Sequence, residues 1–182
     1  MAKKLSDPNE SSRTGKETEI SKSGALLLIR STRFGDLEID AAKVIQVPSG
    51  LVGYGRPQLF VLFEYSQPFH WLQSVDDPSL AFVVIDGLEL ARKFELQAPY
   101  GDPDTDLQPE DEYAVILIVT LREPIDQSTV NLLAPIFVNM RNRRAVQVVY
   151  DDAREKVRYP LFGELLKMKP EHGQKQTQTK NK

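Results

Sequence analysis

Short apolar runs separated by turn residues dominate the chain between residues 25 and 150. The runs are rich in Val, Ile, Phe and Tyr and are punctuated by Gly, Pro and Asp, a pattern typical of strands joined by turns. About ten short strands in about 130 residues predict an all-β, mainly antiparallel single domain with a small β-barrel-like fold. The expected strands are Ala25–Ile29, Asp36–Ile39, Val44–Val47, Leu59–Tyr65, Trp71–Val75, Leu80–Ile85, Lys93–Gln97, Ala114–Leu121, Ile136–Met140 and Ala145–Tyr150.

One of these runs differs from the others because it is apolar on both faces. The segment AVILIVTL, Ala114–Leu121, predicts a central strand that is covered on each side. Two other segments have helical patterns: Ser128–Leu133, which precedes a proline, and Pro160–Met168, in which apolar residues recur at helical spacing. We therefore expect one or two short helical segments beside the strands.

The two ends of the chain are polar. Residues 1–24 contain four apolar side chains and Gly173–Lys182 contains none, so neither end can bury enough surface to offset the entropy of ordering. We predict a disordered extension over residues 1–25, a β-domain over residues 26–162, and a short helix with a disordered basic tail over residues 163–182. No signal-peptide pattern and no run of about 18 to 20 apolar residues occurs, which predicts a cytoplasmic protein that does not enter a membrane.

The composition leaves few routes to catalysis. The chain has no cysteine and only two histidines, His70 and His172, which excludes thiol chemistry and a histidine-based zinc cluster. His70 lies between Phe69 and Trp71, where a half-buried structural histidine is more common than a catalytic base. The glycines of Gly50–Gly55 lack the spacing of a phosphate-binding loop and precede a strand-like run, so they predict a turn.

Charged residues gather in four places. The doublets Asp76–Asp77 and Asp151–Asp152 and the stretch Asp102–Glu112 are acidic, and Arg141–Arg144 is basic. Neighbouring residues of a strand point to opposite faces, so neither acidic doublet forms a catalytic pair by itself. A carboxylate hydrolase would need all four doublet residues to converge in one pocket. The simpler interpretation is a solvated acidic surface and a solvated basic turn.

Two stretches resemble the flagellar assembly factor FliW family. TRFGDLEIDAAKVIQVPSGLVGYGRPQLFVLFEYSQPFHWLQSVDDPSLAFVVID, Thr32–Asp86, is similar to the family's opening strand, glycine turn and W-L-Q-S block. TVNLLAPIFVNMRNRRAVQVV, Thr129–Val149, resembles its N-L-(L)-A-P-I block and the glutamine-bearing strand that follows. The two stretches bracket about 130 residues in the family's order. One departure is Gly87, which stands where the family pattern has a proline.

The resemblance implies a protein that works by binding and needs no cofactor or enzyme activity. Proteins of the family bind the translational repressor CsrA and relieve its repression of the flagellin messenger, and they bind flagellin in the cytoplasm, so that synthesis is coupled to export. We expect the same partners here, no direct binding of nucleic acid or membrane, and a monomer when free. The alternative is a general chaperone-like barrel whose exposed strand edges bind export substrates.

The expected partner-binding residues are the polar members of the two motif blocks: Gln73, Ser74, Asp76, Asp77, Asn131 and Pro135. These positions lie where packing alone would more often select an apolar residue or glycine. For Asn131 an alternative is that it caps the turn at Leu132–Ala134.

Charge is distributed unevenly along the chain. The whole protein has a net charge of −3, whereas residues 31–162 hold 12 basic and 20 acidic side chains, a net charge of −8. The surface of an RNA-binding protein must be basic, so an acidic domain complements it and repels the RNA itself. The charge therefore favours a role in binding such a protein over a role in binding RNA.

Overall fold

A computed structural model describes residues 25–55, 58–151 and 154–165. The elements that precede the sheet's central strand are β1 (Leu26–Ser31), β2 (Gly35–Asp40), the 3₁₀ helix η1 (Ala41–Lys43), β3 (Ile45–Val47), β4 (Gln58–Ser66), β5 (Phe69–Ser74), β6 (Ala81–Asp86) and α1 (Leu88–Lys93). They are followed by β7 (Tyr113–Thr120), η2 (Ile125–Gln127), β8 (Thr129–Val130), β9 (Ile136–Asn139), β10 (Ala145–Gln147), η3 (Arg154–Arg158), β11 (Tyr159–Pro160) and α2 (Phe162–Leu165). Both predicted tails, apart from residues 25 and 163–165, lie outside the described residues.

The main sheet has the strand order β10-β9-β7-β6-β5-β4-β3, and β8 joins β7 to β11. Every pairing between these named strands is antiparallel, which confirms the all-β, mainly antiparallel prediction. The sheet curls so that its two ends approach each other. The backbone N–H of Gln46 in β3 donates to the carbonyl of Arg143 at 2.8 Å, and a single bridge pairs Gln46 with Arg144. The fold is therefore barrel-like, but the barrel is not closed.

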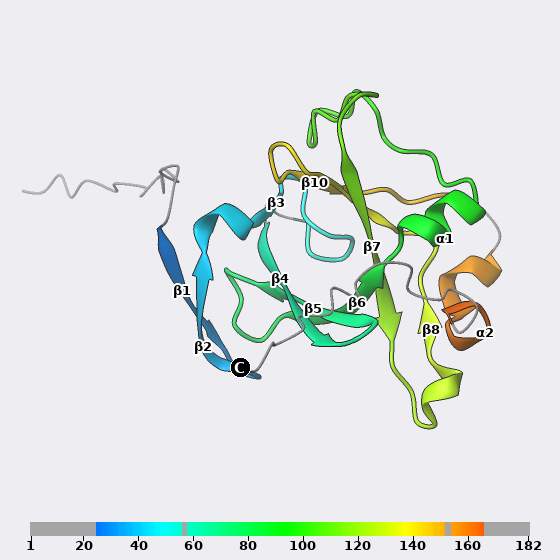
Figure 1. Ribbon diagram of the computed structural model, residues 1–182, viewed down its shortest axis with the longest axis horizontal. Coiled ribbons are helices and arrows are strands. Elements are labelled where there is room, and N and C mark those ends of the chain that lie inside the picture. The colour runs from blue at the N-terminus through cyan, green and yellow to red at the C-terminus, as the bar shows by residue number, and fades with distance from the viewer. Residues whose placement is uncertain (1–24, 56–57, 152–153, 166–182) are drawn as a thin grey trace, which may run out of the picture.

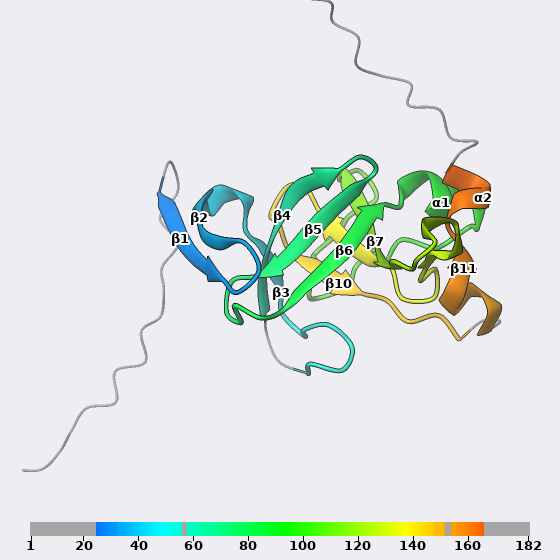
Figure 2. The same cartoon turned by 90° about the horizontal axis from the view of Figure 1, so that it is seen from below.

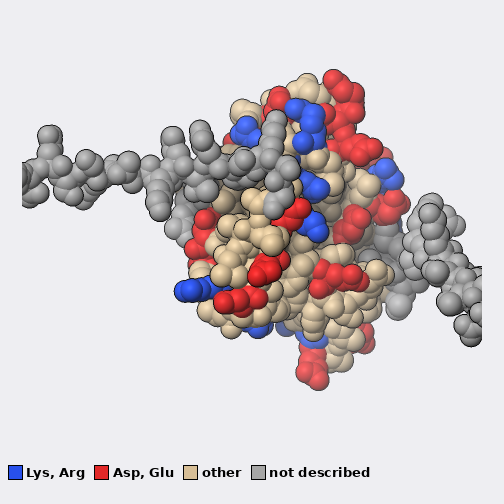
Figure 3. Space-filling view, turned by 60° about the vertical axis from the view of Figure 1, so that its left-hand side comes forward, with Lys and Arg blue, Asp and Glu red and all other residues tan. Residues whose placement is uncertain are grey.

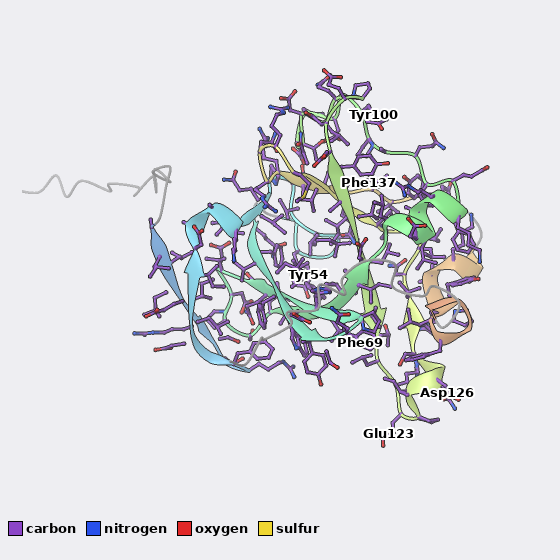
Figure 4. The ribbon with its side chains drawn as sticks, in the orientation of Figure 1. Tyr54, Phe69, Tyr100, Glu123, Asp126 and Phe137 are labelled. Carbon is purple, nitrogen blue, oxygen red and sulfur yellow. The ribbon has the colours of Figure 1, made fainter. Side chains whose placement is uncertain are left out.

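Strand β7 is the centre of this sheet, as its two-sided apolar pattern predicts. Its alternate residues Val115, Leu117 and Val119 pack in one cluster, while Ile116 packs in a second cluster on the opposite face. The first cluster includes the fully buried Phe137, which lies beside β7 in Figure 4, and is covered by α1 and by the segment around β11. The second cluster fills the inside of the curl.

Strands β1 and β2 form a separate two-stranded hairpin. The hairpin lies at one end of the molecule, and α1 and α2 lie at the other end, with the main sheet between them (Figures 1 and 2). Its inward residues pack with Val44 and Val61 in a third cluster. Because Val61 and its neighbour Leu62 point to opposite faces of β4, the hairpin covers the outside of the curl.

Two predicted elements are wrong. Lys93–Gln97 is not a strand: helix α1 occupies Leu88–Lys93 and buries Leu90 and Ala91, and Glu95 adopts a left-handed φ of 53° that ends it. The alternation of Phe94 and Leu96 imitates a strand, although both pack on the first cluster from the turn after α1.

Ser128–Leu133 is not a helix. Thr129 and Val130 form β8, because Val130 pairs with Val119 of β7 on one side and with Tyr159 of β11 on the other. The second predicted helix, Pro160–Met168, is confirmed in part, because α2 spans Phe162–Leu165. The residues after Leu165 lie outside the described part of the chain.

The described part of the loop between β3 and β4 contains turns, as its glycines predict. Gly50 and Gly53 have φ values of 74° and 91°, in the region that side-chain-bearing residues avoid. The loop is followed by β4, whereas a phosphate-binding loop leads into a helix.

Gly87, the departure from the family pattern, occupies a position where a side chain does not fit. Its N–H donates to the carbonyl of Val115 at 2.7 Å, a bond that a proline could not make. A Cβ built on Gly87 would lie 2.4 Å from Cγ of Leu117. Glycine therefore lets the start of α1 approach the centre of β7.

Replacing Gly87 by alanine should lower the free energy of unfolding by about 1 to 3 kcal/mol, because the added methyl group overpacks the core against Leu117. Urea denaturation of both proteins measures the change. Gly163→Ala is the matched control, since a Cβ at this exposed position in α2 would meet no heavy atom within 4 Å. Equal stability of the Gly87→Ala variant and the native protein would contradict the packing described.

Candidate functional site

The end of β5 and the turn that joins it to β6 carry four of the six predicted site residues. Gln73 is fully buried. Its Oε1 accepts from the Ser31 hydroxyl at 2.9 Å, and its Nε2 donates to the carbonyls of Ser74 at 2.9 Å and Leu80 at 3.0 Å. The amide of Gln73 thus ties the β1–β2 hairpin to the β5–β6 turn across 42 residues of sequence. These internal hydrogen bonds account for a polar residue at this buried position.

The other three residues of this group shape the turn. The buried Ser74 hydroxyl accepts from the N–H groups of Asp76 at 3.2 Å and Asp77 at 3.0 Å. The exposed Asp76 accepts from the N–H of Leu59, and Asp77 accepts from the N–H and hydroxyl of Ser79. The two carboxylates therefore have separate partners, and of the four residues only Asp76 is exposed.

Asn131 and Pro135 lie apart from this group, in the connection from β8 to β9. Oδ1 of Asn131 accepts from the N–H of Leu133 at 3.0 Å, which confirms the alternative that Asn131 caps this turn. Pro135 is buried, and its carbonyl accepts from Val148. The fold places no hydrogen bond between these two residues and the β5–β6 turn among the described contacts. Whether any of the six residues contacts a partner stays a prediction.

The outward face of the hairpin combines leucines with carboxylates, a feature that the sequence analysis did not single out. Leu26 and Leu28 of β1 are 70% and 56% exposed. They stand opposite Asp40 and Glu38 of β2, and Arg30 stands opposite Asp36. We call these six residues the hairpin face. On the side of the molecule where the hairpin lies, several groups of acidic side chains are visible, with basic side chains between them (Figure 3).

An aromatic cluster anchors the tip of the hairpin to the main sheet. Phe34 lies with its ring centroid 5.0 Å from that of Phe63 and 5.1 Å from that of Trp71, both in edge-on geometry. Tyr65 makes a similar contact with Trp71, and the Arg33 guanidinium lies 5.0 Å from the Trp71 ring. Such ring contacts stabilise beyond the area that they bury. The tip of the hairpin is therefore held to the main sheet twice, by this cluster and by the hydrogen bond between Ser31 and Gln73.

The basic turn is an ion-paired structure, which corrects the expectation of simple solvation. Arg141 donates from Nε to Asp111 at 3.0 Å and from Nη2 to Asp106 at 3.1 Å. Arg144 donates to the carbonyl of Pro103 at 3.2 Å. The acidic stretch Asp102–Glu112 is thus folded back over the basic turn. The contact lowers the pKa of Asp111 below its ordinary value of 3.8, chiefly through the hydrogen bond from Arg141 and then that from the Gln108 N–H.

The arrangement is suited to binding. Among the described residues, no three His, Cys, Asp or Glu side chains gather in a way that could hold a metal ion. In the same part of the chain no helix is long and apolar enough to cross a membrane. The exposed features are surfaces: a leucine and carboxylate face on a firmly anchored hairpin, next to an acidic turn.

Substituting Gln73 by alanine should loosen the hairpin. The change leaves the buried Ser31 hydroxyl without its acceptor and removes one of the two donors to the Leu80 carbonyl, at a cost of about 1 to 3 kcal/mol. Hydrogen exchange followed by mass spectrometry should show faster exchange in residues 26–40 and little change in β7. Gln127→Ala, at an exposed position, is the control. Uniform acceleration over all strands, or no change in the hairpin, would be inconsistent with the tie.

The Asp111–Arg141 pair should make stability depend on pH. Because the pKa of Asp111 is lower in the folded state, its contribution is fully present above the ordinary value of 3.8 and is lost as the pH falls through the folded-state value. The difference in unfolding free energy between the native protein and Asp111→Asn should therefore be largest near neutral pH and shrink as the pH falls below about 4. Urea denaturation at a series of pH values measures it. The exposed neighbour offers the control Glu110→Gln. A difference that stays constant with pH would contradict the ion pair.

Comparison with known proteins gives one consistent result. The model of the FliW protein family matches residues 28–161. The flagellar assembly factor FliW of Caldicellulosiruptor saccharolyticus is 34% identical over 140 residues, which cover 76% of this chain and 92% of that protein. The corresponding protein of Oceanobacillus iheyensis is 37% identical over 124 residues, which cover 66% and 84%.

The fold agrees with this relationship. A crystal structure of the flagellar assembly factor FliW superposes with a TM-score of 0.61 at 29% sequence identity, covering 73% of this chain and 95% of that one. The matched segment includes every strand of the main sheet as well as β8 and β11. The chain belongs to the FliW family of flagellar assembly factors.

Proposed function

We propose that this protein binds the translational regulator CsrA and relieves its repression of the flagellin messenger, and that it also binds flagellin in the cytoplasm, coupling flagellin synthesis to export. Membership of the FliW family supports a role in flagellar assembly. The partners follow from the sequence resemblance, and the observation that carries the first of them is the acidic surface described above.

The hairpin face is the region that we propose for CsrA. Its three carboxylates, Asp36, Glu38 and Asp40, accompany one cation, Arg30, and its two exposed leucines supply apolar area. A basic partner with an apolar patch complements this combination, since opposite charges steer the encounter and apolar contacts stabilise the complex. The same carboxylates repel RNA, so the protein would take CsrA from the messenger without binding the messenger itself.

The anchoring of the hairpin favours this role. The hydrogen bonds of Gln73 and the contacts of Phe34 fix the hairpin before a partner arrives. A surface held in its binding conformation loses little conformational entropy on association. The β5–β6 turn lies next to the hairpin, since the N–H of Thr32 donates to the carbonyl of Pro78. Among the predicted site residues, Asp76 therefore extends the acidic surface onto this turn.

The chaperone-like alternative has one observation in its favour. The hairpin is a separate sheet of two strands, so the outer edge of β1 has no strand partner among the described residues. An extended segment of an export substrate could pair with such an edge. This alternative predicts similar affinity for unrelated export substrates, whereas the proposed function predicts selective binding of CsrA and flagellin.

Reversing the charge of the hairpin face should weaken CsrA binding. The double variant Asp36→Lys/Glu38→Lys should lower the affinity about tenfold or more, equivalent to about 1.4 kcal/mol, because it replaces attraction by repulsion. Isothermal titration calorimetry measures the affinity at low and physiological salt. The native complex should weaken as salt rises, since the Debye length falls to about 8 Å at physiological ionic strength.

The matched control changes the same net charge elsewhere. Glu123 and Asp126 lie at the tip of the loop between β7 and β8, far from the hairpin (Figure 4). Glu123→Lys/Asp126→Lys should leave the affinity within about threefold of the native value, because screening weakens charges beyond a Debye length. Equal losses in both double variants would reduce the effect to net charge, and absence of binding to both CsrA and flagellin at low salt would refute the proposed function.

A further inference from the structure

A cavity of about 190 Å³ opens inside the curl of the main sheet. Its lining residues come from strands near both ends of the sheet, among them Ile45 of β3 and Val138 of β9. The cavity therefore lies on the inner face of the curled sheet. Ile45, Val84, Ile116 and Val138 are buried and form an apolar floor. No sequence motif pointed to it.

The mouth of the cavity is partly apolar as well. Leu62 and Met140 line it and are each 38% exposed. Exposed apolar side chains around an apolar cavity are typical of a surface that is covered when a partner binds. The hairpin covers the opposite face of β4, so the cavity and the hairpin face are separate surfaces.

Three polar side chains also line the cavity: His70, Asp86 and Arg143. Asp86 accepts from the N–H of Leu88 at 2.9 Å, the first residue of α1. The Arg143 guanidinium has one described contact, from Nη1 to the Met140 sulfur at 3.9 Å, and makes no ion pair with a described residue. Of the three arginines in the basic turn, Arg141 is ion-paired and Arg144 bonds to a carbonyl. Arg143 thus has donors left for a ligand.

The backbone conformation at Arg143 is one that smaller residues adopt more readily, so local backbone preference does not explain an arginine at this position. Arg143 closes the β9–β10 turn with a φ of 59°, and its N–H donates to the Asn139 carbonyl. Glycine or asparagine takes this left-handed conformation more readily. The turn therefore holds a long cation at the cavity in a position where local backbone preference favours a small residue.

The size of the cavity limits what it can hold. A dry cavity of about 150 Å³ lined by aliphatic and aromatic residues accommodates benzene, whereas pockets for drug-sized ligands measure about 300 to 1,000 Å³. The present volume suits one bulky side chain. A guanidinium at its edge suits a carboxylate, which it can bind through two parallel hydrogen bonds.

We propose that this cavity is an anchor pocket for one bulky apolar side chain of a partner polypeptide, and that Arg143 binds the acidic side chain next to it. This proposal rests on the proposed function, because both require that the protein binds other proteins. It adds that two classes of partner segment bind two different surfaces. Basic segments bind the hairpin face, whereas apolar-acidic segments bind the inner face of the sheet. A buried side chain at the centre of a contact is the usual energetic anchor of an interface.

The test is a titration of the full isotope-labelled chain with three blocked dipeptides, followed by methyl NMR. Acetyl-Phe-Asp-amide should shift the methyl signals of Ile45, Val84 and Ile116 saturably, while those of Leu26 on the hairpin stay in place. Acetyl-Phe-Lys-amide and acetyl-Ala-Asp-amide should each bind about fivefold more weakly or worse, since each lacks one of the two contacts. No saturable shift, or equal affinity for all three peptides, would overturn the proposal.

Variants of Arg143 test the role of the cation. Glycine adopts the left-handed backbone conformation without strain, so the Arg143→Gly variant should fold. Arg143→Gln keeps a long polar side chain. Both should abolish the preference for Asp over Lys in the dipeptide, whereas Arg122→Gln in the β7–β8 loop should preserve it. A preference that survives in both Arg143 variants would contradict the assignment. The titration contains neither CsrA nor flagellin, so its outcome is independent of whether those partners bind.

Discussion

The structure depends on the burial of β7 on both faces. A strand that is apolar on each side cannot lie at a surface, so the chain must supply a layer against each face. On one side the main sheet curls until β3 meets the turn before β10, and the second apolar cluster fills the space inside. On the other side α1 and the segment around β11 cover Val115, Leu117 and Val119. Gly87 belongs to the same constraint, because only a residue without a side chain lets the chain pass so close to Leu117.

The division into two faces extends to the surfaces available for binding. Alternate residues of β4 point outward to the hairpin and inward to the cavity, so one strand separates the two. The outward surface is acidic with exposed leucines and is held by Gln73 and the Phe34 cluster. The inward surface is an apolar cavity with Arg143 at its edge. A small domain can in this way present one surface suited to basic segments and another suited to apolar-acidic segments, without a change of fold.

The sequence alone was sufficient for features that depend on local pattern. The two-sided apolar run predicted β7, the glycines predicted the turn before β4, and the position of Asn131 before its turn suggested the cap that it forms. The secondary-structure predictions were wrong where contacts with residues distant in the sequence determine the conformation. The segment at Thr129–Val130 is a strand only because β7 and β11 flank it, and the alternation after Lys93 imitates a strand although it packs from a turn.

The same distinction applies to the candidate site. Gln73 stands out in the sequence as a polar residue among apolar ones, but its partner Ser31 is 42 residues away and no local pattern reveals it. The cation at the cavity was visible only as one arginine of a basic run, because the ion pairs that occupy Arg141 come from a separate loop.

We propose that this acidic binding domain, without affinity for RNA, controls an RNA-binding protein. The most direct measurement is an electrophoretic mobility shift of labelled flagellin messenger with CsrA, titrated with this protein and then with flagellin. We predict that the protein alone leaves the RNA unshifted, that it releases the RNA from CsrA, and that added flagellin restores the CsrA–RNA complex. A shift of the RNA by this protein alone, or a CsrA–RNA complex that persists at saturating protein, would contradict the account.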